Sequence, residues 1–304
     1  MEKLFVILGP TAVGKTAASL KIAQRLRSPI INADSRQIFD GIPIGTAAPT
    51  AEQLSLVKHY FVGRCQLTDY YSASMFEEEV LHLLSPEGEL GELPYVVMSG
   101  GSMMYIDAVC NGIDDIPTID AETRSLMKRR LEEEGLERLV DELRVLDPEY
   151  FAIVDRKNIR RVVHALEICY MTGRPYSSYR TNERKKRPFD IVKIGLNRER
   201  EELYSRINQR VCDMLSQGLE AEARRVYPLK GLNALNTVGF KEMFEYIEGL
   251  CTLDEAVAKI QGNTRKYCRK QLTWFKRAPD IHWFHPGDET GIMAFIDTFS
   301  TPAS

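Results

Sequence analysis

The stretch GPTAVGKT, residues 9–16, decides the fold of this chain. It matches G-x-x-x-x-G-K-[ST], in which glycines let backbone N–H groups face phosphate oxygens and a lysine adds positive charge. The apolar run KLFVIL precedes it and the helical pattern TAASLKIAQRL follows it, so an anion would sit at a helix N-terminus. We therefore predict a phosphate site made by Gly9, Pro10, Thr11, Ala12, Val13, Gly14, Lys15 and Thr16, with the Thr16 hydroxyl as a candidate Mg²⁺ ligand.

Three further apolar runs, 29–34, 93–101 and 189–197, are separated by helical patterns. This alternation predicts an α/β fold of the P-loop NTPase type, in which a parallel sheet is flanked by helices. Before the last run lies an all-helical stretch that is too long for an ordinary crossover. We expect a core domain over 1–117 and 188–304, and an inserted helical domain over 118–187.

Bulk properties exclude some classes of protein. The 304 residues include six scattered cysteines without a C-x-x-C pair, which disfavours zinc and disulfides. No apolar run is long enough for a bilayer and the first residues do not resemble a signal peptide, so we expect a cytoplasmic monomer without membrane contact. The net charge of −3 alone disfavours RNA binding, but the runs RKNIRR (156–161), RTNERKKR (180–187) and TRKYCRKQLTWFKR (264–277) are basic.

Asp34 ends the second predicted strand, next to the phosphate loop. It could hold Mg²⁺, accept a proton from a nucleophile, or simply stabilise a turn. The third strand ends MSGGS and offers no second carboxylate, which disfavours ATP hydrolysis. At the same edge Ser102 offers a hydroxyl beside two glycines, a pattern that suits either a close ligand or a plain turn.

Taken in order, these segments resemble the tRNA dimethylallyltransferase family, whose members place a five-carbon prenyl group on an adenosine beside the anticodon. The resemblance covers nearly the whole chain. It is carried by GPTAVGKT, INADSRQIFDGIPIGTAAP, HYFVG, YYSASMF, GGSMMYI, RRVVHALEICYMTGRP, RINQRVCDMLSQGLEAE, LNTVGFKE and TRKYCRKQLTWFKR.

The resemblance implies that the loop binds the diphosphate of dimethylallyl diphosphate with Mg²⁺, and that Asp34 is the general base on the adenine amine. The implied catalytic set is Lys15, Thr16, Asp34, Ser102, Arg206 and Arg210. The acceptor would be adenosine 37 of tRNAs that read codons beginning with U, recognised through the anticodon stem-loop. The implied tRNA contacts are Asp34, Ser35, Arg36, Gln37, Ser102, Arg124, Arg160, Arg161, His164 and Lys241.

The basic run 264–277 suits RNA independently of the resemblance. Lys266, Lys270 and Arg277 are expected on one helix face, and core packing is favoured for the rings of Trp274 and Phe275. The candidate RNA-binding residues of this run are Arg265, Arg269, Lys270, Gln271, Trp274 and Lys276.

Departures from the family pattern predict a changed substrate range and rate, as in a diverged paralogue. Met103 and Met104 follow Ser102 where GGTGLY is usual, Ala48 replaces a lysine, and His164 replaces an arginine. Three other functions stay open. They are a P-loop small-molecule kinase, a prenyltransferase acting on free adenine nucleotides, and an RNA-binding nucleotide sensor without enzymatic activity.

Overall fold

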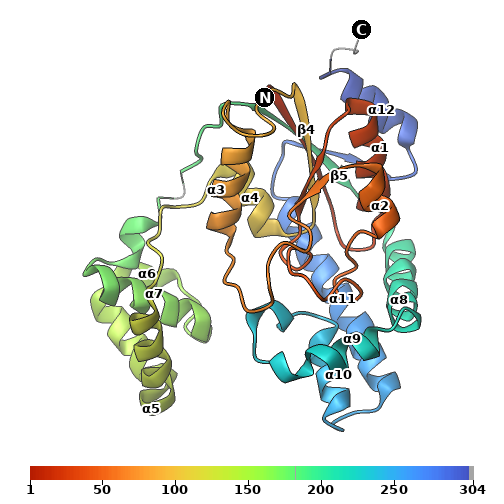
Figure 1. Ribbon diagram of the computed structural model, residues 1–304. Helices are drawn as coiled ribbons and strands as arrows, with labels where there is room; N and C mark the ends of the chain where they lie inside the picture. The colour runs from red at the N-terminus through yellow and green to blue at the C-terminus, as the bar shows by residue number, and fades with distance from the viewer. Residues whose placement is uncertain (182, 301–304) are drawn as a thin grey trace. The chain divides into compact units, whose positions relative to one another are not determined.

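The computed structural model describes residues 1–181 and 183–300 (Figure 1). It consists of two compact units. One unit joins Met1–Cys110 to the chain from Arg187 onward, and the other is Asn111–Lys186. The sequence placed these boundaries at 117/118 and 187/188, and residue 182 and positions 301–304 of the predicted domains lie outside the described residues.

The first unit contains one sheet of parallel strands in the order β3-β2-β4-β1-β5-β6. The strands are β1 (Lys3–Leu8), β2 (Ile30–Ala33), β3 (His59–Tyr60), β4 (Tyr95–Gly100), β5 (Asp190–Leu196) and β6 (Ile281–Phe284). The predicted α/β class is confirmed. Sequence analysis missed the two edge strands, because β3 has only two residues and the short apolar run of β6 is interrupted by His282.

Strand β1 shows why the sheet is buried on both faces. Successive side chains of a strand point to opposite faces. Leu4, Val6 and Leu8 belong to one buried cluster, whereas Phe5 and Ile7 belong to another. A strand that is apolar in both registers requires helices on both sides, and this arrangement brings the loops after the strands to one edge.

Helices cover both faces of the sheet (Figure 1). Buried residues of α1 and α12 pack in the cluster that holds Phe5, and those of α3 and α4 pack in the cluster that holds Leu4. The helices of this unit are α1 (Lys15–Leu26), α2 (Ala51–Leu56), α3 (Ala73–Leu84), α4 (Met103–Asn111, which ends one residue inside the second unit), α8 (Arg200–Ser216), α9 (Leu219–Val226), α10 (Phe240–Ile247), α11 (Leu253–Phe275) and α12 (Glu289–Asp297). No helix among the described residues is long and apolar enough to cross a membrane.

Helix α11 begins as predicted and ends earlier than predicted. Thr252 and Glu255 form the capping box expected from TLDE. The helix ends at Phe275, so Arg277 lies beyond it and does not share a helix face with Lys266 and Lys270. The Arg277 guanidinium instead lies 5.6 Å from the centre of the Trp274 ring.

Arg187, the last residue of the basic run 180–187, is buried and is not part of a solvated surface. Its guanidinium donates to Ala108 O at 2.7 Å and to Glu77 Oε1 at 2.6 Å. Both charged side chains are less than a tenth exposed. Arg187 is therefore a buried anchor at the point where the chain returns to the sheet unit.

The second unit is a helical bundle with its own core. It contains α5 (Ala121–Leu146), α6 (Pro148–Ile153) and α7 (Ile159–Thr172), followed by a 3₁₀ turn (Tyr176–Tyr179). Asp120 and Asn158 cap α5 and α7, and Gly173 ends α7 in the left-handed conformation. Gly135 has φ 79° and breaks the helical geometry, yet α5 continues beyond it.

Candidate active site

The phosphate loop joins β1 to α1, and cationic side chains surround its carbonyl oxygens. Lys15 Nζ donates to Gly9 O at 3.0 Å and to Pro10 O at 2.8 Å. Arg206 Nε donates to Ala12 O at 2.9 Å. Gly14 enters the helix at φ 113°, a conformation that favours glycine. The loop is thereby held open toward an anion at the N-terminus of α1.

Burial and neighbouring positive charge lower two pKa values at this loop. Burial, followed by the nearby Arg210 charge, lowers the pKa of Lys15 to about 8, although Asp34 acts in the opposite direction. Burial and then Arg206 lower the pKa of Arg210. Cations that repel one another in a partly buried site are stabilised when a polyanion binds between them. The electrostatics therefore favour a ligand with several negative charges.

Asp34 lies at the end of β2 and stabilises the turn that follows it. Its Oδ1 accepts from Arg36 N at 2.9 Å and from Gln37 N at 3.3 Å. The hydrogen bonds recorded among the described residues engage only Oδ1. The turn and the proton-accepting roles are therefore compatible, because the turn leaves the second carboxylate oxygen for a ligand.

Ser102 connects the β4 edge to the β2 edge. Its Oγ accepts from Ser35 N at 2.8 Å and donates to Ser35 Oγ at 3.1 Å. Ser102 is 7% exposed. The Ser102 hydroxyl thus holds Ser35, the residue next to Asp34, in place.

Gln271 of α11 links the phosphate loop to the loop after β4. Its Oε1 accepts from Thr11 N at 2.9 Å, and its Nε2 donates to Gly101 O at 2.8 Å. It is 2% exposed. A Cβ at residue 101 would lie 2.6 Å from Gln271 Nε2, so the close approach requires glycine there. The structure thus places Gln271 inside the candidate site and away from the exposed basic face.

Comparison with known proteins assigns the family. A family model described as IPP transferase matches residues 37–278. A tRNA dimethylallyltransferase 1 from Phocaeicola vulgatus is 59% identical over 300 residues, which cover 97% of this chain and 98% of the relative. The chain belongs to the IPP transferase family. The resemblance inferred from the sequence motifs is therefore confirmed.

Solved structures of other proteins agree with the fold of this IPP transferase family chain. A full-length tRNA isopentenylpyrophosphate transferase from Bacillus halodurans is 33% identical with a TM-score of 0.71, covering 98% of this chain and 96% of that one. A eukaryotic dimethylallyltransferase acting on tRNA is 22% identical with a TM-score of 0.82, covering 100% of this chain and 81% of that one. The second likeness is one of fold.

The residues implied for catalysis all belong to the sheet unit of this family chain. They lie in the first turn of α1, on the loops after β2 and β4 and on α8, and they are Lys15, Thr16, Asp34, Ser102, Arg206 and Arg210. The implied tRNA contacts Arg124, Arg160, Arg161 and His164 belong to the helical unit. Arg124 is exposed in the first turn of α5, and Arg160 and Arg161 are exposed in the first turn of α7.

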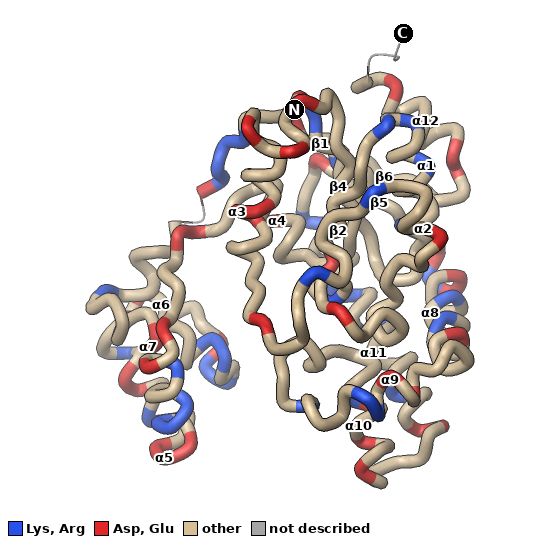
Figure 2. The backbone as a smooth tube through the Cα atoms, in the orientation of Figure 1, with Lys and Arg blue, Asp and Glu red and all other residues tan. Residues whose placement is uncertain are grey.

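His164 and its neighbours show that the helical unit is not uniformly basic. His164 Nδ1 lies 3.7 Å from Glu167 Oε2, and its ring meets Tyr176 edge to face. Along α5, basic and acidic residues alternate (Figure 2). Basic charge in this unit is therefore confined to short clusters such as the start of α7.

Arg36 and Gln37 hold the backbone of neighbouring segments. The Arg36 guanidinium donates to Asn233 O at 2.7 Å. Gln37 Nε2 donates to Thr46 O at 3.0 Å and to Ala47 O at 2.9 Å. Both side chains therefore stabilise the loop around Asp34. The tRNA contact expected of them stays a prediction.

The basic face of α11 is smaller than its sequence implies. Arg265 donates to Asn208 Oδ1 at 2.5 Å, Arg269 donates to Tyr204 Oη at 3.1 Å, and Trp274 Nε1 donates to Asp107 Oδ2 at 2.8 Å. Arg265 and Trp274 are half-buried. The exposed cations among the candidates of this region are Lys241 in α10, Arg269 and Lys270 in α11, and Lys276 directly after α11.

Sequence reasoning missed two residues that support the site. Arg198 follows β5 directly, and its Nε donates to Val13 O at 2.8 Å. Glu222 is 3% exposed and accepts from Gly45 N at 2.7 Å, while burial raises its pKa. The position of Arg198 near a strand end could have predicted a role in the site. No local sequence pattern distinguishes Glu222 from the other glutamate in GLEAE.

Replacing Gln271 with leucine is expected to lower kcat/KM for prenyl transfer about 100-fold, because the two loops lose their common link and small misplacements are costly. We also expect the free energy of unfolding to fall by about 1–3 kcal/mol, since Thr11 N and Gly101 O lose their partner. Steady-state kinetics and urea unfolding measure the two effects. Gln261→Leu, on the same helix, is the matched control. Full activity in a destabilised Gln271→Leu protein would limit Gln271 to packing.

Proposed function

We propose that this chain transfers a dimethylallyl group from dimethylallyl diphosphate to the exocyclic amine of adenosine 37, in tRNAs that read codons beginning with U, and releases diphosphate. The observation that carries the proposal is the pairing of a cation-rich phosphate loop with a single carboxylate, Asp34, at a neighbouring strand end. Membership of the IPP transferase family supports the same reaction.

The bond changes explain why one carboxylate suffices. The adenine amine nitrogen attacks C1 of the donor, and the C1–O bond breaks with its electron pair passing to the diphosphate. The amine then loses a proton, which the Asp34 carboxylate accepts and passes to solvent. Because Oδ1 is engaged by Arg36 N and Gln37 N, Oδ2 is the oxygen that we assign to the proton.

The leaving diphosphate determines the rest of the site. Negative charge develops on it as the C1–O bond breaks, and preorganised cations and N–H groups stabilise that charge. Lys15, Arg206 and Arg210 supply the cations, and the loop and the first turn of α1 supply N–H donors. Burial, followed by mutual repulsion, lowers the pKa values of Lys15 and Arg210, and a bound diphosphate would favour the charged forms of both side chains.

The donor atoms present fit Mg²⁺ held largely by the substrate. The Thr16 hydroxyl at the start of α1 is a hard oxygen ligand, and Mg²⁺ commonly binds few protein groups together with substrate phosphates. Among the described residues, no group of three or more His, Cys, Asp or Glu could hold a metal ion. Mg²⁺ bound to Thr16 and the diphosphate would neutralise charge on the leaving group.

The acceptor base must leave its stack before it can reach Asp34. Ser35 and Ser102, which are joined through their hydroxyl groups, lie next to Asp34 and would border the extruded adenine. Exposed cations on α7, α10 and α11 would bind tRNA phosphates. We propose that the protein acts on tRNA in the cytoplasm as a monomer.

The deciding assay combines purified protein, Mg²⁺, dimethylallyl diphosphate and an unmodified tRNA whose anticodon reads a codon beginning with U. We expect a dimethylallylated adenosine in the nucleoside digest, detected by mass spectrometry. The same tRNA transcribed with guanosine at position 37 is the control. Rapid ATP turnover without alkylated adenosine would support the kinase function instead, and product formed on free AMP alone would support the nucleotide prenyltransferase.

A further inference from the structure

Glu222 of α9 is a buried carboxylate that binds the backbone of segment 41–48, which follows the Asp34 turn. Its Oε2 accepts from Ile44 N at 3.0 Å and its Oε1 accepts from Gly45 N at 2.7 Å. The side chain is 3% exposed, and burial raises its pKa although both N–H groups lower it. A buried carboxylate is costly unless it is hydrogen-bonded. Here both of its oxygens bind one short segment.

Segment 41–48 fits closely against α9 and α10. Arg225 of α9 donates to Gly41 O. A Cβ at residue 45 would lie 2.5 Å from Phe240 Cζ and 3.2 Å from Glu222 Oε1, and Phe240 is fully buried. The close approach of residue 45 to the carboxylate therefore requires glycine, and the segment is held against α9 at its start and in its middle.

The other end of the segment is bonded to the turn that contains Asp34. Gln37 Nε2 donates to Thr46 O at 3.0 Å and to Ala47 O at 2.9 Å. The backbone N–H of the same glutamine donates to Asp34 Oδ1 at 3.3 Å. The carboxylate of Glu222 is thus connected to the carboxylate of Asp34 through one short segment and one glutamine.

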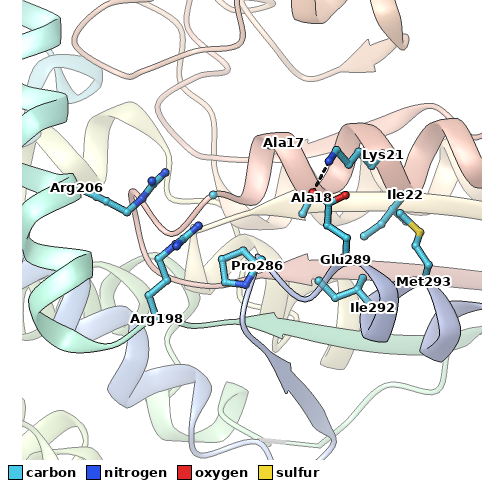
Figure 3. Close-up of a pocket in the computed structure, with 12 residues that line it drawn as sticks. Ala17, Ala18, Lys21, Ile22, Arg198, Arg206, Pro286, Glu289, Ile292 and Met293 are labelled. Atoms are coloured by element: carbon cyan, nitrogen blue, oxygen red, sulfur yellow. Dashed lines mark hydrogen bonds and ion pairs between the residues drawn. The ribbon is translucent and has the colours of Figure 1, made fainter.

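The phosphate loop has supports of its own. Arg198 and Arg206 donate through Nε to carbonyl oxygens of this loop at 2.8 Å and 2.9 Å, and Figure 3 shows both side chains. Among the hydrogen bonds recorded for residues 1–181 and 183–300, none joins the phosphate loop to the segment held by Glu222. A change at Glu222 is therefore expected to affect Asp34 and to spare the diphosphate site.

We propose that Glu222 is a positioning residue for prenyl transfer, which holds segment 41–48 so that Gln37 keeps Asp34 in line with the adenine amine. Glu222 acts through these residues and does not touch the substrate. The inference rests on the proposed function, in which Asp34 accepts the amine proton. A general base must lie about 2.6–3.2 Å from the group that it deprotonates, so a small shift of the turn lowers the rate of transfer without weakening donor binding.

A double-mutant cycle between Glu222 and Asp34 tests this role. Glu222→Gln keeps the size of the side chain but turns an amide N–H₂ toward one of the two backbone N–H groups. We expect the single-turnover rate at saturating donor and tRNA to fall about tenfold, because small misplacements of a catalytic group are costly. The Kd for dimethylallyl diphosphate, measured by calorimetry, should stay unchanged.

In the Asp34→Asn background, the same Glu222→Gln change should lower the remaining rate by less than about twofold, because a residue that acts only through another loses its effect when that other is gone. Glu220→Gln is the matched control. It makes the same chemical change on the same helix and removes an ion pair with Arg224, and we expect it to transfer at the wild-type rate.

Gly45→Ala disturbs the same segment through its contact with Phe240 and should reproduce the loss of rate, so it provides the test if Glu222→Gln does not fold. Retained donor binding shows that a variant is folded. A wild-type rate in the folded variants, or an equal loss in the Asp34→Asn background, would overturn the positioning role. The wild-type rate alone tests the proposed function, whereas the ratio of variant to wild-type rate tests Glu222, so the two failures are distinguishable.

Discussion

The Asp34→Asn variant is expected to lose prenyl transfer by about 10²–10⁴-fold, the usual contribution of a general base. Asparagine keeps an oxygen that can accept from Arg36 N and Gln37 N, so the turn after β2 stays intact. What is lost is the group that accepts the amine proton. Single-turnover transfer with saturating donor and tRNA measures the effect, and a tRNA filter-binding assay should show nearly unchanged affinity.

Asp34→Ala provides the contrast. It removes the proton acceptor and also the two hydrogen bonds of the turn, so its unfolding free energy should fall about 1 kcal/mol further than that of Asp34→Asn. If the asparagine variant transferred at the wild-type rate while alanine did not, Asp34 would be a structural turn residue. Weakened tRNA binding in both variants, with an unchanged rate at saturation, would assign it to RNA contact.

The Lys15→Ala variant should lose about 10²–10³-fold in kcat/KM for dimethylallyl diphosphate, comparable with the loss of one preorganised donor to a developing anion. Lys15 Nζ bonds the carbonyl oxygens of Gly9 and Pro10 within the loop. Its charge therefore lies where the diphosphate binds. Thr273→Ala, an exposed change on α11, is the control. Unchanged kcat/KM in Lys15→Ala would remove the lysine from the leaving-group site.

The same lysine predicts a pH dependence. Its pKa in the free protein is lowered to about 8 by burial and by Arg210, so the protonated form that binds diphosphate is complete below this pH and is lost above it. We expect kcat/KM to fall about tenfold for each pH unit above that value, because kcat/KM reports the free enzyme. Lys15→Arg keeps its charge throughout, and its slower reaction should lack this alkaline decline. An identical decline in both proteins would assign it to another group.

Local sequence patterns predicted the elements that build the site. The glycine spacing of 9–16 and the apolar runs before Asp34 and Ser102 place three loops at one edge of a parallel sheet, and the structure brings those loops together. The caps at Asp120, Asn158 and Thr252 also follow from short-range chemistry. Each of these features depends on residues that lie within a few positions of one another in the sequence.

What the sequence missed depends on partners far along the chain. In the sequence, Gln271 is one polar residue in a basic helix. In the structure, its side-chain amide forms hydrogen bonds with Thr11 and Gly101, which are 260 and 170 positions away. The sequence alone does not show that Arg187 is buried, because its ion-pair partner Glu77 is distant in the chain. Strand β6 forms by pairing with the edge of β5, and its short sequence does not predict a strand by itself. Long-range pairing of this kind leaves no local pattern.

Helix α11 contributes residues both to the donor site and to the proposed tRNA contacts. Its inner side holds Gln271 between two loops, and its outer side displays Arg269 and Lys270, the two residues before Gln271, to solvent. A tRNA held by these cations and a diphosphate held by the phosphate loop would both contact this one helix. We therefore expect each substrate to alter the affinity for the other, and any such coupling is equal in both directions.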